Sequence, residues 1–159
     1  MRMTTTDTTA EVTTTSGRWR DPATWGGILA LCGGIFHTVV AALMRQEVWA
    51  RIFDEGFFNT VALDPSPDRL PMAEAFWFSP GSFGVPLLLL GALVLRQTRR
   101  GERVPGWLGS GVVAWAVLIG LLGGFDGGTI ILLLIGALFL AGAWFGKNSS
   151  GRGRGIMNP

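Results

Sequence analysis

Four long apolar stretches, almost free of charge, constrain the fold of this chain more than any other feature. They cover residues 24–44, 73–95, 105–124 and 127–146. Within them only His37 and Glu74 are acidic or basic. Each stretch is close to the roughly 20 apolar residues that a helix needs to cross a bilayer. Because these stretches fill more than half of the chain, we predict an all-α fold over residues 21–146, a bundle of four transmembrane helices surrounded by the lipid bilayer.

The flanking segments lack apolar runs. Residues 1–20 are rich in threonine and residues 147–159 are basic and rich in glycine, so we expect both to be disordered tails. The first apolar stretch begins too late for a usual signal peptide and is predicted to be retained. Cys32 is the single cysteine. An intramolecular disulfide and a cysteine-based metal site are therefore excluded, and we expect Cys32 to be a small buried side chain.

Basic residues divide unequally between the two sides that four crossings create. One side carries ten: Arg2, Arg18, Arg20, Arg96, Arg99, Arg100, Arg103, Lys147, Arg152 and Arg154. The other carries only Arg45, Arg51 and Arg69, together with five acidic residues. The positive-inside rule then predicts that both termini are cytoplasmic. The strong preference for arginine over lysine is typical of a GC-rich bacterial genome, so we expect the bacterial inner membrane. The basic connection RQTRRGERVPG is expected to contact anionic lipid headgroups rather than nucleic acid.

The long outer connection, residues 45–72, contains a second helical pattern. In QEVWARIFDEG the apolar residues Val48, Trp49, Ile52 and Phe53 share one helical face. Gly56 follows at a position suited to end a helix. We predict an amphipathic helix that lies at the outer interface or folds over the mouth of the bundle.

Small residues repeat every four positions in the apolar stretches, and helices in lipid associate through such residues. The repeats are Gly26, Ala30, Gly34, Thr38 and Ala42; Gly106, Ser110 and Ala114; Ala116, Gly120 and Gly124; and Gly142 and Gly146. They predict a compact bundle and offer faces for a homo-oligomer. Pro80 and Pro86 interrupt the second crossing, and each removes a backbone donor. We expect that crossing to be bent or opened in its outer half, with the hydroxyls of Ser79 and Ser82 available to the freed carbonyls.

His37 is the candidate functional residue, because an ionisable side chain inside a membrane helix is costly without a partner. It lies roughly 10 Å from the outer end of the first crossing at 1.5 Å per residue. Glu74 and Asp126 are expected near the same side, so the three side chains could converge on one outward-facing pocket. Proton transfer is the chemistry that such a group permits. One histidine and two carboxylates make a poor zinc site, and no nucleotide-binding motif is present; we expect neither a metal nor a cofactor.

Each of these residues also has a structural interpretation. His37 could be a neutral clamp that bonds to a carbonyl or a serine. Glu74 could complement a helix dipole, and Asp126 could cap the last helix. These alternatives stay open at the level of sequence.

Three segments carry a resemblance: GGIFH, then RIFDEGFFNTV, then AEAFWFSPGSFGVPLLLLGALV. They resemble a family of small four-helix bacterial membrane proteins, common in actinobacteria and defined as a domain of unknown function. The resemblance covers about residues 24–146 and implies a fold and a topology but no reaction. His37, Asn59, Glu74, Phe76 and Trp77 match its motif. The turn GGFDGG departs from the proline-containing equivalent expected there.

Two functions remain in competition. The first is binding of a lipophilic small molecule in an outward-facing pocket near His37, lined by Trp49, Asn59, Phe76, Trp77, Ser79 and Phe83. The second is a small membrane-embedded cyclase or isomerase that acts on an isoprenoid- or polyketide-like substrate, with His37, Glu74 and Asp126 as catalytic groups. A transporter is the weakest alternative, because no inverted repeat is apparent.

Overall fold

The computed structural model describes residues 21–58, 60–62 and 64–149, and the side chains among them as far as residue 145. All regular structure in this part of the chain is helical. The six helices are α1 (Pro22–Met44), α2 (Gln46–Asp54), α3 (Leu70–Phe78), α4 (Gly84–Arg99), α5 (Gly106–Gly123) and α6 (Gly127–Ser149). The helix α6 thus extends past the expected boundary at residue 146, and the segments 1–20 and 150–159 lie outside the described residues.

Three of the described helices are long and apolar enough to cross a membrane, which indicates a membrane protein. They are α1, α5 and the segment Gly127–Phe145 of α6. Residues 73–95 do not form the single helix expected of them. They are divided between α3, of 9 residues, and α4, of 16 residues. Neither piece alone reaches the roughly 20 residues of a membrane span.

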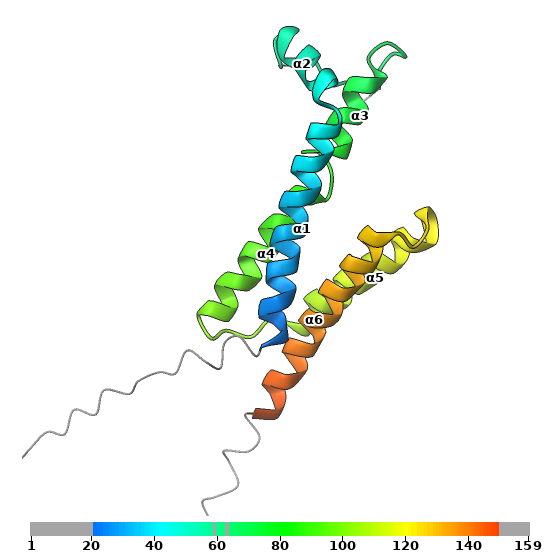
Figure 1. Ribbon diagram of the computed structural model, residues 1–159. Coiled ribbons are helices and arrows are strands. Elements are labelled where there is room, and N and C mark those ends of the chain that lie inside the picture. Colours follow the sequence, from blue (N-terminus) through cyan, green and yellow to red (C-terminus); the bar gives the residue numbers. More distant parts are fainter. Residues whose placement is uncertain (1–20, 59, 63, 150–159) are drawn as a thin grey trace, which may run out of the picture.

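Helix α1 is the centre of the arrangement (Figure 1). The antiparallel helix α4 packs along its N-terminal part, and α3 lies along its C-terminal part. In the α5–α6 hairpin, helix α6 makes the contact with α1, near the N-terminal end of α1. The hairpin leans away from the C-terminal end of α1 (Figure 1). The first residues of α1 and the last residues of α6 consequently lie at the same end of the molecule.

Local sequence explains where α1 begins. Asp21 is its N-cap, and the carboxylate accepts a hydrogen bond from the backbone N–H of Ala23 at 3.0 Å. Pro22 is the first helical residue, where its missing N–H costs nothing. This Asp-Pro pair starts the helix two residues before the apolar stretch.

Small residues bring the helices into backbone contact. A Cβ on Gly91 of α4 would lie 2.7 Å from the carbonyl oxygen of Gly27 in α1, and one on Gly109 of α5 would lie 2.9 Å from that of Gly136 in α6. The repeat in α1 is largely buried as far as Gly34. In α5 only the Ala116–Gly120 repeat is buried.

Two packing expectations are wrong. Ser110 and Ala114 are exposed, because α5 turns the face of Gly109, Val112 and Ala116 toward α6. Cys32 is exposed rather than buried. It lies two residues from both Ala30 and Gly34, which places it on the opposite side of α1 from the buried repeat.

The amphipathic helix of the outer connection is α2, and it ends where the sequence indicates. Gly56 has φ +102° and follows the C-cap Glu55. The N–H of Gly56 donates to the carbonyl of Phe53 at 3.1 Å, and the N–H of Phe57 donates to that of Ile52 at 2.9 Å. This pair of bonds is the Schellman motif. Ile52 is the buried residue of α2, whereas Phe53 stays exposed.

Candidate functional site

The break between α3 and α4 carries its own hydrogen bonds. The Ser79 hydroxyl donates to the carbonyl of Ala75 at 2.7 Å, and the Ser82 hydroxyl donates to the carbonyl of Ser79 at 2.6 Å. The Ser82 hydroxyl in turn accepts from the N–H of Gly84 at 3.2 Å. These bonds supply polar partners within an apolar region, where an unpaired backbone group costs several kcal/mol.

The two prolines fall where a helix can tolerate them. The carbonyl of Phe76, which a donor at Pro80 would have reached, accepts instead from the N–H of Gly81 at 2.9 Å. Pro86 is the third residue of α4. The first N–H groups of a helix have no partner within it, so Pro86 removes none of the bonds of α4. The irregularity predicted from the prolines therefore lies at Ser79–Phe83.

Gly84 places the start of α4 against the middle of α1. A Cβ on Gly84 would lie 2.5 Å from the Thr38 hydroxyl oxygen and 3.1 Å from Cδ2 of His37. Any larger residue would push α4 away from both side chains. The break and the glycine together bring the backbone of α4 onto His37 and Thr38.

Three aromatic rings continue this contact from α1 to α5. The imidazole of His37 stacks on the ring of Phe83, with centroids 4.5 Å apart and planes inclined by 27°. Phe83 meets Trp115 edge-on, with centroids 5.8 Å apart. Phe83 thus links the first helix to the α5–α6 hairpin.

Two polar atoms beside these rings have no hydrogen-bond partner among the described residues. Nε2 of His37 and Oγ1 of Thr38 are both buried, and neither has a hydrogen bond within the described part of the chain. Leaving such a group unsatisfied costs about 1–3 kcal/mol. Two adjacent side chains of one helix therefore offer unused hydrogen-bonding capacity in an apolar environment.

Glu74 and Asp126 have other partners. The Arg45 guanidinium donates to the carboxylate of Glu74 at 3.2 Å, and Arg45 lies about two turns beyond His37. The carboxylate of Asp126 accepts from the backbone N–H of Thr129 at 2.8 Å and from its hydroxyl at 2.9 Å. These bonds lower the pKa of Asp126 below its usual 3.8. Glu74 is thus an ion-pair partner and Asp126 a helix cap, and no described hydrogen bond joins either to His37.

The remaining predicted site residues are dispersed over α2, α3 and the break between α3 and α4. Trp49 lies in α2, and its buried Nε1 has no hydrogen-bond partner among the described residues. Phe76 and Trp77 meet edge-on at 5.1 Å in α3, and Ser79 is fully buried. Of the predicted lining, Phe83 is the residue that contacts the imidazole. Asn59 lies outside the described residues.

Sequence reasoning did not single out Thr38, Gly84 or Trp115. Thr38 was recognised only as a member of the small-residue repeat, and its position next to His37 was the available signal. Nothing local to Trp115 shows that it faces Phe83, because that contact depends on how the hairpin packs. Among the described residues, no group of three His, Cys, Asp or Glu side chains could hold a metal ion.

Comparison with known proteins identifies a family. The family of unknown function DUF6463 matches residues 21–146. No curated protein and no solved structure matches the chain. The matched segment contains the residues of the break and of its contacts with α1 and α5, namely His37, Thr38, Ser79, Ser82, Phe83 and Trp115.

Proposed function

We propose that this chain, which belongs to the family of unknown function DUF6463, binds a lipophilic small molecule at His37 and Thr38. The observation that carries the proposal is a pair of buried polar atoms, Nε2 of His37 and Oγ1 of Thr38, that have no hydrogen-bond partner among the described residues. A ligand with one hydroxyl or carbonyl group would supply the missing hydrogen bonds. Its apolar body would remain among the surrounding helices.

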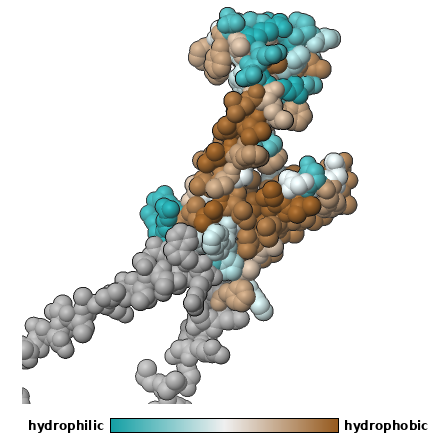
Figure 2. Space-filling view, in the orientation of Figure 1, coloured by the Kyte–Doolittle hydropathy of each residue, from teal (hydrophilic) through white to brown (hydrophobic). Residues whose placement is uncertain are grey.

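The shape of the molecule supports a lipophilic ligand. The hairpin packs on α1 through α6 but makes at most slight contact with α2 and α3. The outer half of α1 therefore exposes apolar side chains, among them Ile35, Val39 and Leu43. Figure 2 shows hydrophobic surface on this part of α1 and on the facing hairpin, with polar residues gathered at the ends. An apolar molecule could reach His37 from the bilayer without passing a polar barrier.

The membrane topology belongs to the same proposal. We take α3, the break and α4 together as one interrupted crossing, which makes a bundle of four crossings with α1, α5 and α6. Interrupted helices are tolerated in membranes where other groups satisfy the broken backbone, and at this break the hydroxyls of Ser79 and Ser82 donate to the carbonyls of Ala75 and Ser79. With four crossings, ten basic residues lie on the side of the termini and three on the other. This distribution supports cytoplasmic termini in a bacterial inner membrane.

A membrane cyclase or isomerase is the second candidate. The contact of His37 with Phe83, and of Phe83 with Trp115, favours this candidate. The imidazole could act as an acid or base, and the aromatic rings could stabilise a cationic intermediate. Glu74 and Asp126 are already engaged elsewhere. Binding requires only the two unpaired atoms and is therefore the simpler conclusion.

Photo-crosslinking tests the binding proposal. The full chain, purified in detergent, is irradiated with a hexadecanol analogue that carries a diazirine and an alkyne, and labelled peptides are mapped by mass spectrometry. We expect labelling near His37 and Phe83. His37→Phe and Thr38→Val, which keep the size of each side chain, should each weaken binding about five-fold, as expected for one hydrogen bond of about 1 kcal/mol.

Two control variants separate the site from general changes in the helices. Phe36→Leu alters the neighbouring side chain, which is 69% exposed. Thr98→Val alters a buried threonine whose hydroxyl donates to Leu95 at 3.2 Å. Both should label as the unsubstituted chain does. Equal labelling of the His37→Phe/Thr38→Val double variant would refute the proposal.

A further inference from the structure

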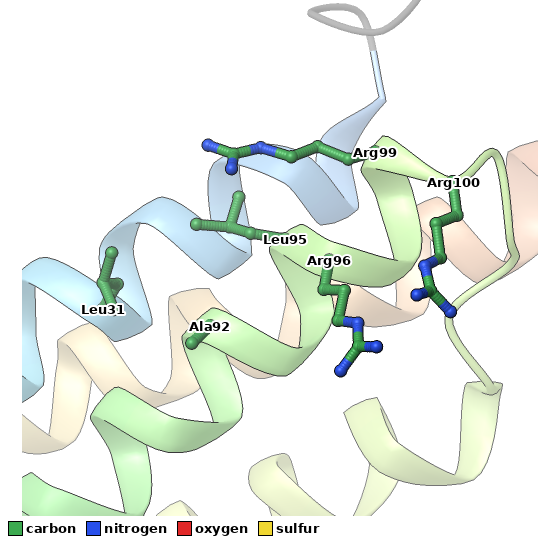
Figure 3. A pocket seen from close by; sticks show the side chains of 6 residues that line it. All are labelled: Leu31, Ala92, Leu95, Arg96, Arg99 and Arg100. Carbon is green, nitrogen blue, oxygen red and sulfur yellow. The ribbon is translucent and has the colours of Figure 1, made fainter.

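An open groove lies between α1 and α4, at the end of the molecule where α4 terminates. Its volume is about 350 Å³, and its lining consists of Leu31, Ala92, Leu95, Arg96, Arg99 and Arg100 (Figure 3). The groove therefore combines three apolar side chains with three basic ones. This site is separate from His37 and does not depend on the function proposed there.

All three arginines line the groove together with its apolar residues. Figure 3 shows Arg99 extended above Leu95, whereas Arg96 and Arg100 both extend downward from α4. Residues four apart are neighbours on a helix surface, so Arg96 and Arg100 can act on one anion. Guanidinium groups bind phosphate oxygens in a bidentate manner.

Among the described residues, little of this positive charge is neutralised by ion pairs. Arg100 approaches Glu102 at 3.9 Å, and both side chains are more than half exposed. Such a pair contributes little. Arg96 and Arg99 have no ion pair in the part of the chain that the structure describes. Mutual repulsion of the three guanidinium groups would be relieved by a bound anion.

Three tryptophans indicate that the groove opens at the level of the lipid headgroups. Trp25 is near the start of α1, Trp107 near the start of α5 and Trp144 near the end of α6, and all three are half exposed or more. These helix ends lie at the same end of the molecule as the end of α4 (Figure 1). Tryptophan is enriched where a membrane meets water. A soluble anion would leave the apolar part of the groove uncovered, whereas a lipid would cover both parts.

We propose that this groove binds an anionic phospholipid. An acyl chain lies against Leu31 and Leu95, and the phosphate is held by Arg96 and Arg100. The charge of the site selects anionic headgroups over zwitterionic ones, and its apolar lining requires an attached chain. Each arginine contributes about a five-fold gain in affinity, the usual effect of one basic residue at an anionic membrane surface.

Native mass spectrometry of the full chain in detergent tests this proposal. The protein is titrated with palmitoyl-oleoyl phosphatidylglycerol, with phosphatidylcholine of the same chains, and with glycerol phosphate. We expect phosphatidylglycerol to bind at least about ten-fold more tightly than the other two. The variant Arg96→Gln/Arg100→Gln should lose about 25-fold in affinity, five-fold for each arginine.

Two further variants distinguish binding in the groove from general attraction of the lipid to positive charge. Ala92→Trp fills the groove from an exposed position without removing any charge, and it should lower phosphatidylglycerol binding to the level of phosphatidylcholine. Arg51→Gln/Arg69→Gln removes the same charge from the outer connection and should have no effect. Unchanged binding by Ala92→Trp, or equal losses in the two arginine pairs, would overturn the proposal in favour of diffuse attraction. Equal affinity for glycerol phosphate would overturn it in favour of a soluble-anion site.

Discussion

Gly34 of α1 faces Gly84 of α4 so closely that a Cβ on Gly34 would lie 2.5 Å from the Gly84 carbonyl oxygen. The same Cβ would lie 2.6 Å from the backbone nitrogen of Leu88. The obstacle is backbone, which cannot rotate away as a flexible side chain can. This contact fixes the distance between α1 and the start of α4, and hence the position of Phe83 against His37.

Gly34→Ala should therefore separate α1 from α4. We expect a loss of about 1–3 kcal/mol in the free energy of unfolding, which is typical of overpacking, measured by thermal or denaturant unfolding in detergent. Gly111→Ala is the matched control, because nothing lies within 4 Å of a Cβ at that exposed position of α5. An equal effect of the two substitutions would show that the α1–α4 contact is looser than described.

Because Asp126 caps α6, the stability of the protein should depend on pH in the acid range. Its pKa is lowered from 3.8, first by the hydrogen bond from the backbone of Thr129 and then by that from the Thr129 side chain. A depressed folded-state pKa contributes stability above the unfolded value, and that stability disappears as the pH falls through the folded value. The difference in Tm between the unsubstituted chain and Asp126→Asn should thus be constant above about pH 5 and shrink below 3.8.

Because the unsubstituted chain and Asp126→Asn differ only at residue 126, the contributions of the other carboxylates to Tm cancel in the difference. Asp126→Ala, which has no cap acceptor, should melt below both of them at neutral pH. A Tm difference that does not change between pH 6 and pH 2.5 would contradict the capping role.

Cysteine accessibility tests whether α3 and α4 together make a crossing. In a Cys32→Ser background, Ala50→Cys in α2, Glu102→Cys after α4 and Gly123→Cys at the end of α5 each introduce one exposed thiol. We expect a membrane-impermeant maleimide to label positions 50 and 123 in intact spheroplasts. Position 102 should react only after permeabilisation. Labelling of positions 50 and 102 from the same side would exclude the fourth crossing.

Much of the fold follows from local patterns. The apolar stretches indicate α1, α5 and α6, and the periodicity of QEVWARIFDEG indicates α2. Pro80 and Pro86 indicate a bent or opened outer half of the second crossing, which the structure has as a break between α3 and α4. Each of these inferences needs only neighbouring residues, because hydropathy, helical period and the missing donor of proline act over one or two turns.

The candidate site could be predicted less completely. His37 stands out because it is an ionisable side chain in an apolar helix. Its expected carboxylate partners depended on which helices face each other, and a sequence does not state this. Arg45 was available to Glu74 because α3 lies along the end of α1. Trp115 reached Phe83 because α5 packs with its Gly109 and Ala116 face inward.

The attachment of the α5–α6 hairpin has a mechanical consequence. Gly26 and Gly142 lie at its contact with α1, and Trp115 lies against Phe83 farther along. At 1.5 Å per residue the 18 residues of α5 form a lever about 27 Å long. A tilt of about 10° at the glycines would displace the free tip by about 5 Å without breaking a helical hydrogen bond. Because Trp115 lies against Phe83 and Phe83 stacks on the imidazole of His37, such a tilt would also change the position of Phe83 relative to His37.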